Sequence, residues 1–293
     1  MRPLKLLLAL DEPFEPLAEV AVASFLLHQP LAAVAVCTPA GCSLERLRRL
    51  CGLFDTPLQQ QVIPADSPLQ ELPPSVRPYF YCIEAMAGVG SGARHLYVDA
   101  DTLCISPLDE LVQLRLDPAR PFAVCSHGRP MPDRQLCLEL PSAYHYFNAG
   151  VILFDPSPGM QPISASQVVQ FYLQHQALCR FREQCALNHL LRQKVVFLPN
   201  QYNYLSWMRD RQADSPWHDL KANPMAYTLA SIRQSLAIVH FSAGALPSRL
   251  PADRLEQPDH YWLQLQAALT QATAASDLPR YGDAPFGASA DPQ

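Results

Sequence analysis

Short apolar runs recur along the chain and predict strands. Several of these runs are continuous rather than alternating, which is typical of strands buried on both faces of a sheet. Between them, apolar residues recur at helical spacing, as Leu17, Val20, Ala21 and Leu27 do, with Ser24 on the same face. The alternation predicts an α/β fold with a mainly parallel sheet covered by helices. The predicted strands are 4–10, 32–37, 61–63, 95–98, 122–125, 149–154, 195–198 and 237–241.

Further helices are expected from periodicity and from capping residues. Ser43 has the chemistry of an N-cap and would start a helix over 46–50. The other predicted helices are 79–87, 166–174, 184–191 and 260–269. From residue 272 the sequence turns to Ala, Ser, Asp, Pro and Gly without periodicity. We therefore expect one domain over residues 1–271 and a flexible tail over 272–293.

Composition narrows the classes of function. The chain has 293 residues, of which 49% are hydrophobic and 17% charged, and its net charge is −5. No cluster of Lys and Arg is present, so neither nucleic acid nor a polybasic membrane contact is expected. The apolar runs are shorter than the ~20 residues of a transmembrane helix. Nine cysteines without a Cys-x-x-Cys pair indicate neither zinc nor a disulfide framework, and favour a reduced, cytoplasmic protein.

Two aspartates, Asp99 and Asp101, follow the apolar run 95–98. In an extended segment their side chains would face the same side, because the side-chain period of a strand is two. Repulsion and desolvation make such a pair costly unless a positive charge lies between the carboxylates. A hard divalent cation, which prefers oxygen ligands, would remove that cost. From this pattern alone a metal site and a turn capped by Asp101 are equally favoured.

The segments around this pair resemble glycosyltransferase family 8, the family of glycogenin and bacterial lipopolysaccharide galactosyltransferases. The similarity includes Y-V-D-A-D-T-L at 97–103 and continues in the family's order over residues 4–247. The other similar segments are A-L-D-E-P-F at 9–14, Y-F-N-A-G-V-I-L at 146–153, E-Q-C-A-L-N at 183–188, L-P-N-Q-Y-N at 198–203 and I-V-H-F at 238–241. Six motifs in one order make coincidence a poor explanation.

The resemblance implies a GT-A fold, with a nucleotide-binding half over about 1–125 and an acceptor-side half over about 126–271. It implies a metal-dependent retaining glycosyltransferase that moves a hexose, glucose or galactose, from a UDP-sugar to a glycan, protein or small-molecule acceptor. The cofactor would be Mn²⁺ or Mg²⁺, bound by Asp99, Asp101 and His240.

The same resemblance assigns the remaining site residues. Catalytic roles are implied for Asn148, Glu183 and Gln184, and donor contacts for Ala9, Asp11, Asp99, Ala100, Asp101, Gly150 and Arg249. Asp11 would recognise the uracil and ribose. Gln184 would face the anomeric carbon, and its amide would stabilise an oxocarbenium-like state in a same-face attack, because an amide is a poor nucleophile.

Three departures from the family pattern bear on activity. Cys185 replaces the second acidic residue of D-Q-D. The lysine of H-F-x-G-x-x-K-P-W has no match, and Arg249 is the candidate replacement. The basic residue on the helix before the aspartates is missing, and Arg77 is the nearest one. Trp207, Trp217 and Tyr227 are candidates for stacking on an acceptor sugar.

Two alternative functions remain open. The departures favour a non-catalytic relative that binds a sugar nucleotide or glycan. A phosphatase of the haloacid dehalogenase type also has a D-x-D-x-[TV] motif at a strand end. In this chain the fifth position of that motif is Leu103 and no acidic pair follows on a later strand, so the phosphatase is the less favoured alternative.

Overall fold

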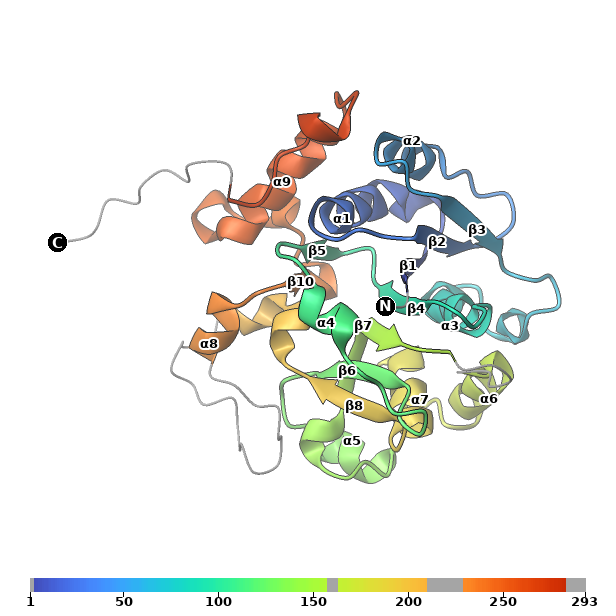
Figure 1. The fold of residues 1–293 in the computed structure, drawn as a ribbon. Helices are drawn as coiled ribbons and strands as arrows, with labels where there is room; N and C mark the ends of the chain where they lie inside the picture. The colour runs from blue at the N-terminus through green and yellow to red at the C-terminus, as the bar shows by residue number, and fades with distance from the viewer. Residues whose placement is uncertain (1–2, 157–162, 210–228, 283–293) are drawn as a thin grey trace.

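The computed structural model describes residues 3–156, 163–209 and 229–282 of the chain. Seven strands form a central sheet in the order β3-β2-β1-β4-β7-β6-β8 (Figure 1). Only β7 runs antiparallel to its neighbours, β4 and β6, so the predicted mainly parallel sheet is confirmed. The strands are β1 (Leu4–Ala9), β2 (Ala33–Thr38), β3 (Leu58–Val62), β4 (Arg94–Val98), β6 (Phe122–Ser126), β7 (Phe147–Phe154) and β8 (Val195–Leu198).

The reversed direction of β7 matters for the site. Because β7 is antiparallel to β4, its first residues lie beside the carboxyl end of β4, with Val98 opposite Val151. The amide of Asp99 donates to the carbonyl of Gly150 at 2.9 Å, which extends this pairing past the end of β4. The carboxyl ends of β1 and β4 and the start of β7 therefore share one edge of the sheet, where ligands bind in open α/β sheets.

A second, three-stranded sheet lies at the same edge, in the order β5-β10-β9. It consists of β5 (Thr102–Cys104), β9 (Tyr204–Leu205) and β10 (Ile238–His240). The antiparallel pairing of β10 with β5 sets His240 opposite Thr102. Hydrophobic periodicity predicted neither β5 nor β9, because each is too short to carry a pattern.

Helices cover both faces of the central sheet. One core contains Leu6 and Leu8 of β1 together with α1 (Glu15–His28), α2 (Glu45–Leu53) and α9 (Gln257–Leu269). The other core contains Leu7 together with α3 (Tyr81–Ala87), α6 (Ala165–Gln174) and α7 (Arg182–Leu191). The continuous apolar run of β1 thus faces helices on both sides. Shorter helices are α4 (Asp109–Gln113), α5 (Pro132–Cys137) and α8 (Leu229–Gln234).

The predicted helix start at Ser43 is wrong. Helix α2 begins at Glu45, and its N-cap, Leu44, provides no side-chain cap. A carboxylate from the neighbouring helix α1 caps α2 instead, because Glu15 Oε1 accepts a hydrogen bond from the amide of Leu47 at 3.2 Å. A buried backbone amide in the first turn of the helix, which has no partner within the helix, is thus satisfied by tertiary packing, which the local pattern does not encode.

The predicted flexible tail does not begin at residue 272. Ala272 and Leu278 are buried, and Arg280 Nη1 donates to the carbonyl of Leu27 in α1 at 3.0 Å. The chain therefore stays packed as far as residue 282, and residues 283–293 of the predicted tail lie outside the described part. Across the described helices, none combines the length and the apolar composition that a bilayer crossing requires.

His95 makes the stability of the fold sensitive to mild acid. It lies buried in β4, stacks on Phe154 at 5.4 Å between ring centroids, and its Nδ1 has no hydrogen-bond partner. Burial, with a smaller contribution from Lys5, lowers the pKa of His95 to about 4. The unfolded chain therefore takes up a proton as the pH falls below about 6.5 while the folded chain does not. The stability contributed by neutral His95 is complete above that pH and is lost as the pH falls towards 4.

We expect the free energy of unfolding to fall by about 2 kcal/mol through His95 between about pH 7.5 and pH 5. Urea unfolding of the wild type and of His95→Phe, which keeps a ring beside Phe154, measures this contribution as a difference. An equal pH dependence in the two proteins would contradict the assignment.

Candidate functional site

Asp99 and Asp101 lie in the turn that follows β4, not in the strand itself. The turn is closed by Thr102, whose amide and hydroxyl both donate to the carbonyl of Asp99, at 3.2 and 2.8 Å. Asp99 Oδ1 accepts from the Tyr97 hydroxyl at 2.8 Å. Because Thr102 closes the turn, the Asp101 side chain is not needed as its cap.

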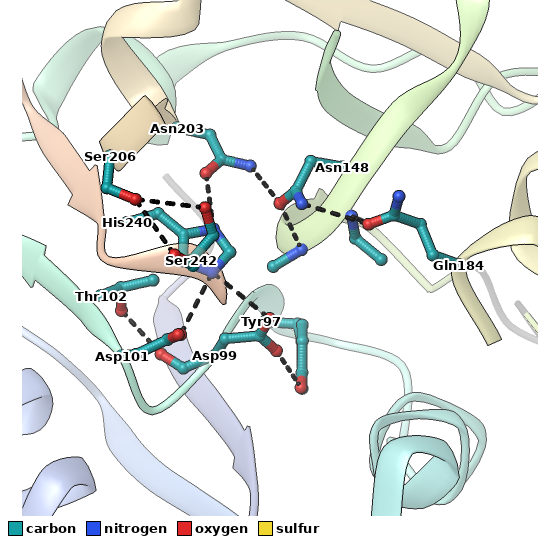
Figure 2. A network of polar contacts seen from close by, with 12 residues as sticks. Tyr97, Asp99, Asp101, Thr102, Asn148, Gln184, Asn203, Ser206, His240 and Ser242 are labelled. Carbon is teal, nitrogen blue, oxygen red and sulfur yellow. Dashed lines mark hydrogen bonds and ion pairs between the residues drawn. The ribbon is translucent and has the colours of Figure 1, made fainter. Parts of the chain in front are cut away.

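The Asp101 carboxylate instead meets His240. His240 Nε2 lies 3.1 Å from Asp101 Oδ1 and 3.6 Å from Asp99 Oδ2 (Figure 2). One possible ligand atom from each of the three side chains lies within 4.8 Å of the others, and no second trio of this kind occurs among the described residues. The side chain of His240 is 4% exposed, against 42% and 24% for Asp99 and Asp101. The trio thus has a rigid buried side and a side open to solvent.

Gly150 leaves room beside this trio. A Cβ atom at this position would lie 2.2 Å from His240 Cε1 and 2.7 Å from Asp99 Oδ2. Such distances are far below van der Waals contact, so only glycine lets the start of β7 approach the trio this closely. Two carboxylates and an imidazole around an open space match the ligands of a divalent cation.

The pKa values of the trio reflect two carboxylates that compete for one positive neighbour. Burial raises the pKa of Asp99, and the charge of Asp101 adds to this. Burial acts in the same direction on Asp101, but the charge and hydrogen bond of His240 outweigh it and lower the pKa. The two carboxylates in turn outweigh the effect of burial on His240 and raise its pKa. A bound cation would stabilise both carboxylates in their ionised form.

A chain of amide side chains connects His240 to Gln184 (Figure 2). His240 Nδ1 donates to Asn203 Oδ1 at 3.0 Å, and Asn203 Nδ2 donates to Asn148 Oδ1 at 2.9 Å. Asn148 Nδ2 then donates to Gln184 Oε1 at 3.1 Å. Since Asn203 engages Nδ1, Nε2 is the nitrogen of His240 that faces the two aspartates and is available to a metal.

The amide of Gln184 is held at both ends. Its Oε1 accepts from Asn148 and also from the amide of Ala149 at 3.1 Å, and its Nε2 donates to the Tyr146 hydroxyl at 3.1 Å. A carbonyl oxygen has two lone pairs, and both are used here within the protein. Gln184 is therefore a fixed part of the wall of the site, with its oxygen directed to β7.

A pocket of about 450 Å³ opens beside the trio. The predicted residues Ala9, Asp11, Asp99, Ala100, Asp101, Glu183 and Gln184 all line it; Asn148, Gly150 and His240 are not lining residues but are linked to them by the contacts above. Arg249 is exposed in a turn near Gly244 and is not part of the lining. The remaining lining residues are Leu10, Phe14, Leu17, Ser75, Pro78, Tyr79, Tyr81, Cys82, Tyr97 and Ala149.

Glu183 and Asp11 are the two lining residues that have a buried carboxylate oxygen without a hydrogen-bond partner among the described residues. The oxygen of Glu183 is Oε2, and burial, with the charge of Asp99, raises the pKa of Glu183 well above the usual value. The next departure from the family pattern, Cys185, is fully buried and faces away from the pocket, where its Sγ contacts the Tyr146 hydroxyl at 3.1 Å. Cys185 is thus not part of the pocket lining.

Pattern reasoning assigned no role to three residues that hold the site together: Asn203, Tyr97 and Tyr146. All three lie inside the family-like segments, which was the available signal. Of the aromatic residues proposed for acceptor binding, Trp207 packs under Arg129, whose Cζ is 3.9 Å from the ring centroid. Trp217 and Tyr227 lie outside the described residues.

Comparisons with known proteins agree with this geometry. The model of glycosyl transferase family 8 matches residues 80–247, which is more than half of the chain. The lipopolysaccharide 1,2-glucosyltransferase of Escherichia coli K12 is 24% identical over 156 residues, which are 53% of this chain and 44% of that protein. The chain thus matches less than half the length of this curated relative.

Solved structures show the same fold. The galactosyltransferase LgtC, in complex with donor and acceptor sugar analogues, superposes with a TM-score of 0.69 at 15% identity, over 92% of this chain and 97% of that one. The glycosyltransferase GlyE of Streptococcus pneumoniae gives a TM-score of 0.63 at 15% identity, over 98% and 67%.

The fold, together with the aspartate pair at the strand end, is that of a GT-A glycosyltransferase. More narrowly, the chain belongs to glycosyltransferase family 8. This membership leaves the phosphatase alternative without support.

Proposed function

We propose that the protein is a metal-dependent retaining hexosyltransferase that transfers glucose or galactose from a UDP-sugar to a carbohydrate, protein or small-molecule acceptor. The observation that carries this proposal is the Asp99–Asp101–His240 trio, which opens onto a pocket large enough for part of a nucleotide sugar. The names of two similar proteins, a glucosyltransferase and a galactosyltransferase, support a hexose as the transferred group.

We propose the following roles for the site residues. Asp99 and Asp101 would supply oxygen ligands and His240 would supply Nε2 to Mn²⁺ or Mg²⁺. A cation bound there would stabilise negative charge on the departing UDP. Asp11 and Ala9, at the end of β1, would contact the uridine, and Ala100 the diphosphate end of the donor. Arg249 stays a proposed donor contact only if its turn moves towards the pocket.

Glu183 and Gln184 would contact the transferred sugar. The carboxyl of Glu183, kept neutral by burial, can donate a hydrogen bond to a sugar hydroxyl. Gln184 would support the sugar through a fixed amide, with Asn148 as the residue that orients it. We also propose that residues 1–125 form the nucleotide-binding half and residues 126–271 the acceptor-side half; most of the pocket lining comes from the first half.

The test is a panel of UDP-sugars incubated with the protein and Mn²⁺, with release of UDP as the measurement. We expect UDP release from UDP-glucose or UDP-galactose, and its loss on adding EDTA. Retention is checked by the anomeric configuration of the product.

Two other outcomes are informative. UDP binding without turnover of any donor would favour the non-catalytic relative. In favour of that alternative, Gln184 Oε1 already accepts two hydrogen bonds within the protein. UDP release that is equally fast in EDTA would contradict the metal dependence.

A further inference from the structure

The donor pocket has an excess of negative charge. Among the residues that the structure describes, its lining includes four carboxylates, those of Asp11, Asp99, Asp101 and Glu183, and no lysine, arginine or histidine. One divalent cation balances two charges, and a UDP-sugar adds a negatively charged diphosphate. Even with Glu183 neutral, the pocket would hold uncompensated negative charge, which is costly in a partly buried site. A further cation at the rim would lower that cost.

Arg182 lies at this rim. It is the first residue of α7, directly before Glu183 and Gln184, and its Cζ is 3.9 Å from the ring centroid of Tyr79. Tyr79 lines the pocket and is 47% exposed, so the stacked guanidinium sits over a ring at the pocket mouth. Its charge acts on the pocket, because it opposes the effect of burial on the pKa of Glu183.

The backbone of Arg182 is strained. Its φ is +46°, in the left-handed region that residues other than glycine and asparagine seldom adopt. The conformation is held by a hydrogen bond from the Arg182 amide to the carbonyl of Cys179, at 2.9 Å, and by the stacking on Tyr79. Strain of this kind costs about 1–3 kcal/mol and concentrates at ligand sites. A role in ligand binding would explain why an arginine occupies this position.

The other arginines considered as diphosphate contacts, Arg77, Arg129 and Arg249, do not line the pocket. Arg77 Nη2 donates to the carbonyls of Gln70 and Leu72, and Arg77 lines a separate cavity of about 570 Å³. Arg129 stacks on Trp207, and Arg249 is exposed outside the lining. Arg182 is thus the arginine that is both stacked on a lining residue and adjacent in sequence to the catalytic candidates.

We propose that Arg182, held over the pocket mouth by Tyr79, binds the diphosphate of the nucleotide-sugar donor. This inference rests on the proposed function, since it requires a nucleoside diphosphate in the pocket. The planar guanidinium can donate two parallel hydrogen bonds to phosphate oxygens, and its charge would add to that of a metal bound by the trio.

The experiment measures the affinity of UDP and of uridine, with Mn²⁺ present, by titration calorimetry. Arg182→Gly removes the guanidinium and suits a positive φ, and Arg182→Asn is a second variant with the same tolerance. We expect both variants to bind UDP about tenfold or more weakly than the wild type, because a charge-assisted bond is lost. Uridine affinity is expected to stay unchanged.

Arg180→Gly is the matched control. Arg180 is an exposed arginine in the turn directly before α7, 5.7 Å from the ring centroid of Phe181, and it does not line the pocket, so this variant makes the same change of charge away from the pocket. It is expected to bind UDP as the wild type does. Thermal unfolding of all variants verifies that each protein is folded.

Equal UDP affinity in the wild type and the folded Arg182 variants would overturn the inference and leave the proposed function intact. An equal loss for Arg180→Gly, or a loss of uridine affinity as large as that of UDP, would also overturn it. If the wild type itself bound neither UDP nor a UDP-sugar with Mn²⁺, the proposed function would fail first.

Discussion

Asp101→Asn and His240→Ala are each expected to lower metal-dependent UDP-sugar hydrolysis more than about 100-fold. Residues that only support a metal ligand already change affinity or activity by about 10–100-fold, and these two would be ligands themselves. Asp101→Asn keeps the size of the side chain but removes the charge that lies 3.1 Å from His240 Nε2. The measurements are UDP release and the binding of Mn²⁺ to each variant.

Asp109→Asn is the control for this loss. Asp109 is an exposed aspartate at the start of α4, a few residues after the turn, and the variant makes the same chemical change. It is expected to keep the activity and Mn²⁺ affinity of the wild type. Full activity in Asp101→Asn and in His240→Ala would show that the trio is not the metal site.

Gly150→Ala is expected to remove activity by filling the space beside the trio. The added methyl group would lie 2.2 Å from His240 Cε1, and a buried ring next to a β-strand has little room to move. We expect Mn²⁺ affinity to fall more than about tenfold, and stability to fall by about 1–3 kcal/mol from overpacking. Metal titration and urea unfolding measure the two effects separately.

Gly52→Ala is the matched control for the glycine substitution. Gly52 lies in α2, and a Cβ atom there would have nothing within 4 Å. Alanine in a helix is more stable than glycine by up to about 1 kcal/mol, so this variant should gain stability and keep its activity. If Gly150→Ala bound Mn²⁺ like the wild type, the close approach of β7 would have no part in the metal site.

Part of the site could be predicted from short segments of sequence. Asp99 and Asp101 follow an apolar run, so the local sequence pattern was enough to predict that they lie at the end of a strand. The partner of Asp101 did not follow from that pattern, and only the family resemblance singled out His240. The structure shows the physical cause: β10 pairs with β5, and the amide of Phe241 donates to the carbonyl of Asp101 at 2.9 Å.

Other features could not be predicted because they depend on contacts between distant segments. Ser43 looks like a helix cap, yet α2 is capped by Glu15 from α1. The segment after residue 272 has the composition of a tail, yet Arg280 is hydrogen-bonded to α1. In both cases contacts with a distant helix, which local composition does not encode, decided the structure.

The alternation of strands and helices, the two-sided burial of the sheet and the similarity to a family can all be recognised in the amino-acid sequence alone. These features follow from periodicity and from motifs a few residues long. Which atoms meet depends on the folded chain: His240 Nε2 lies beside two carboxylates, Asn203 and Asn148 connect His240 to Gln184, and Arg182 stacks on Tyr79. Such contacts join segments far apart in the chain, and side-chain packing, not local pattern, sets their distances.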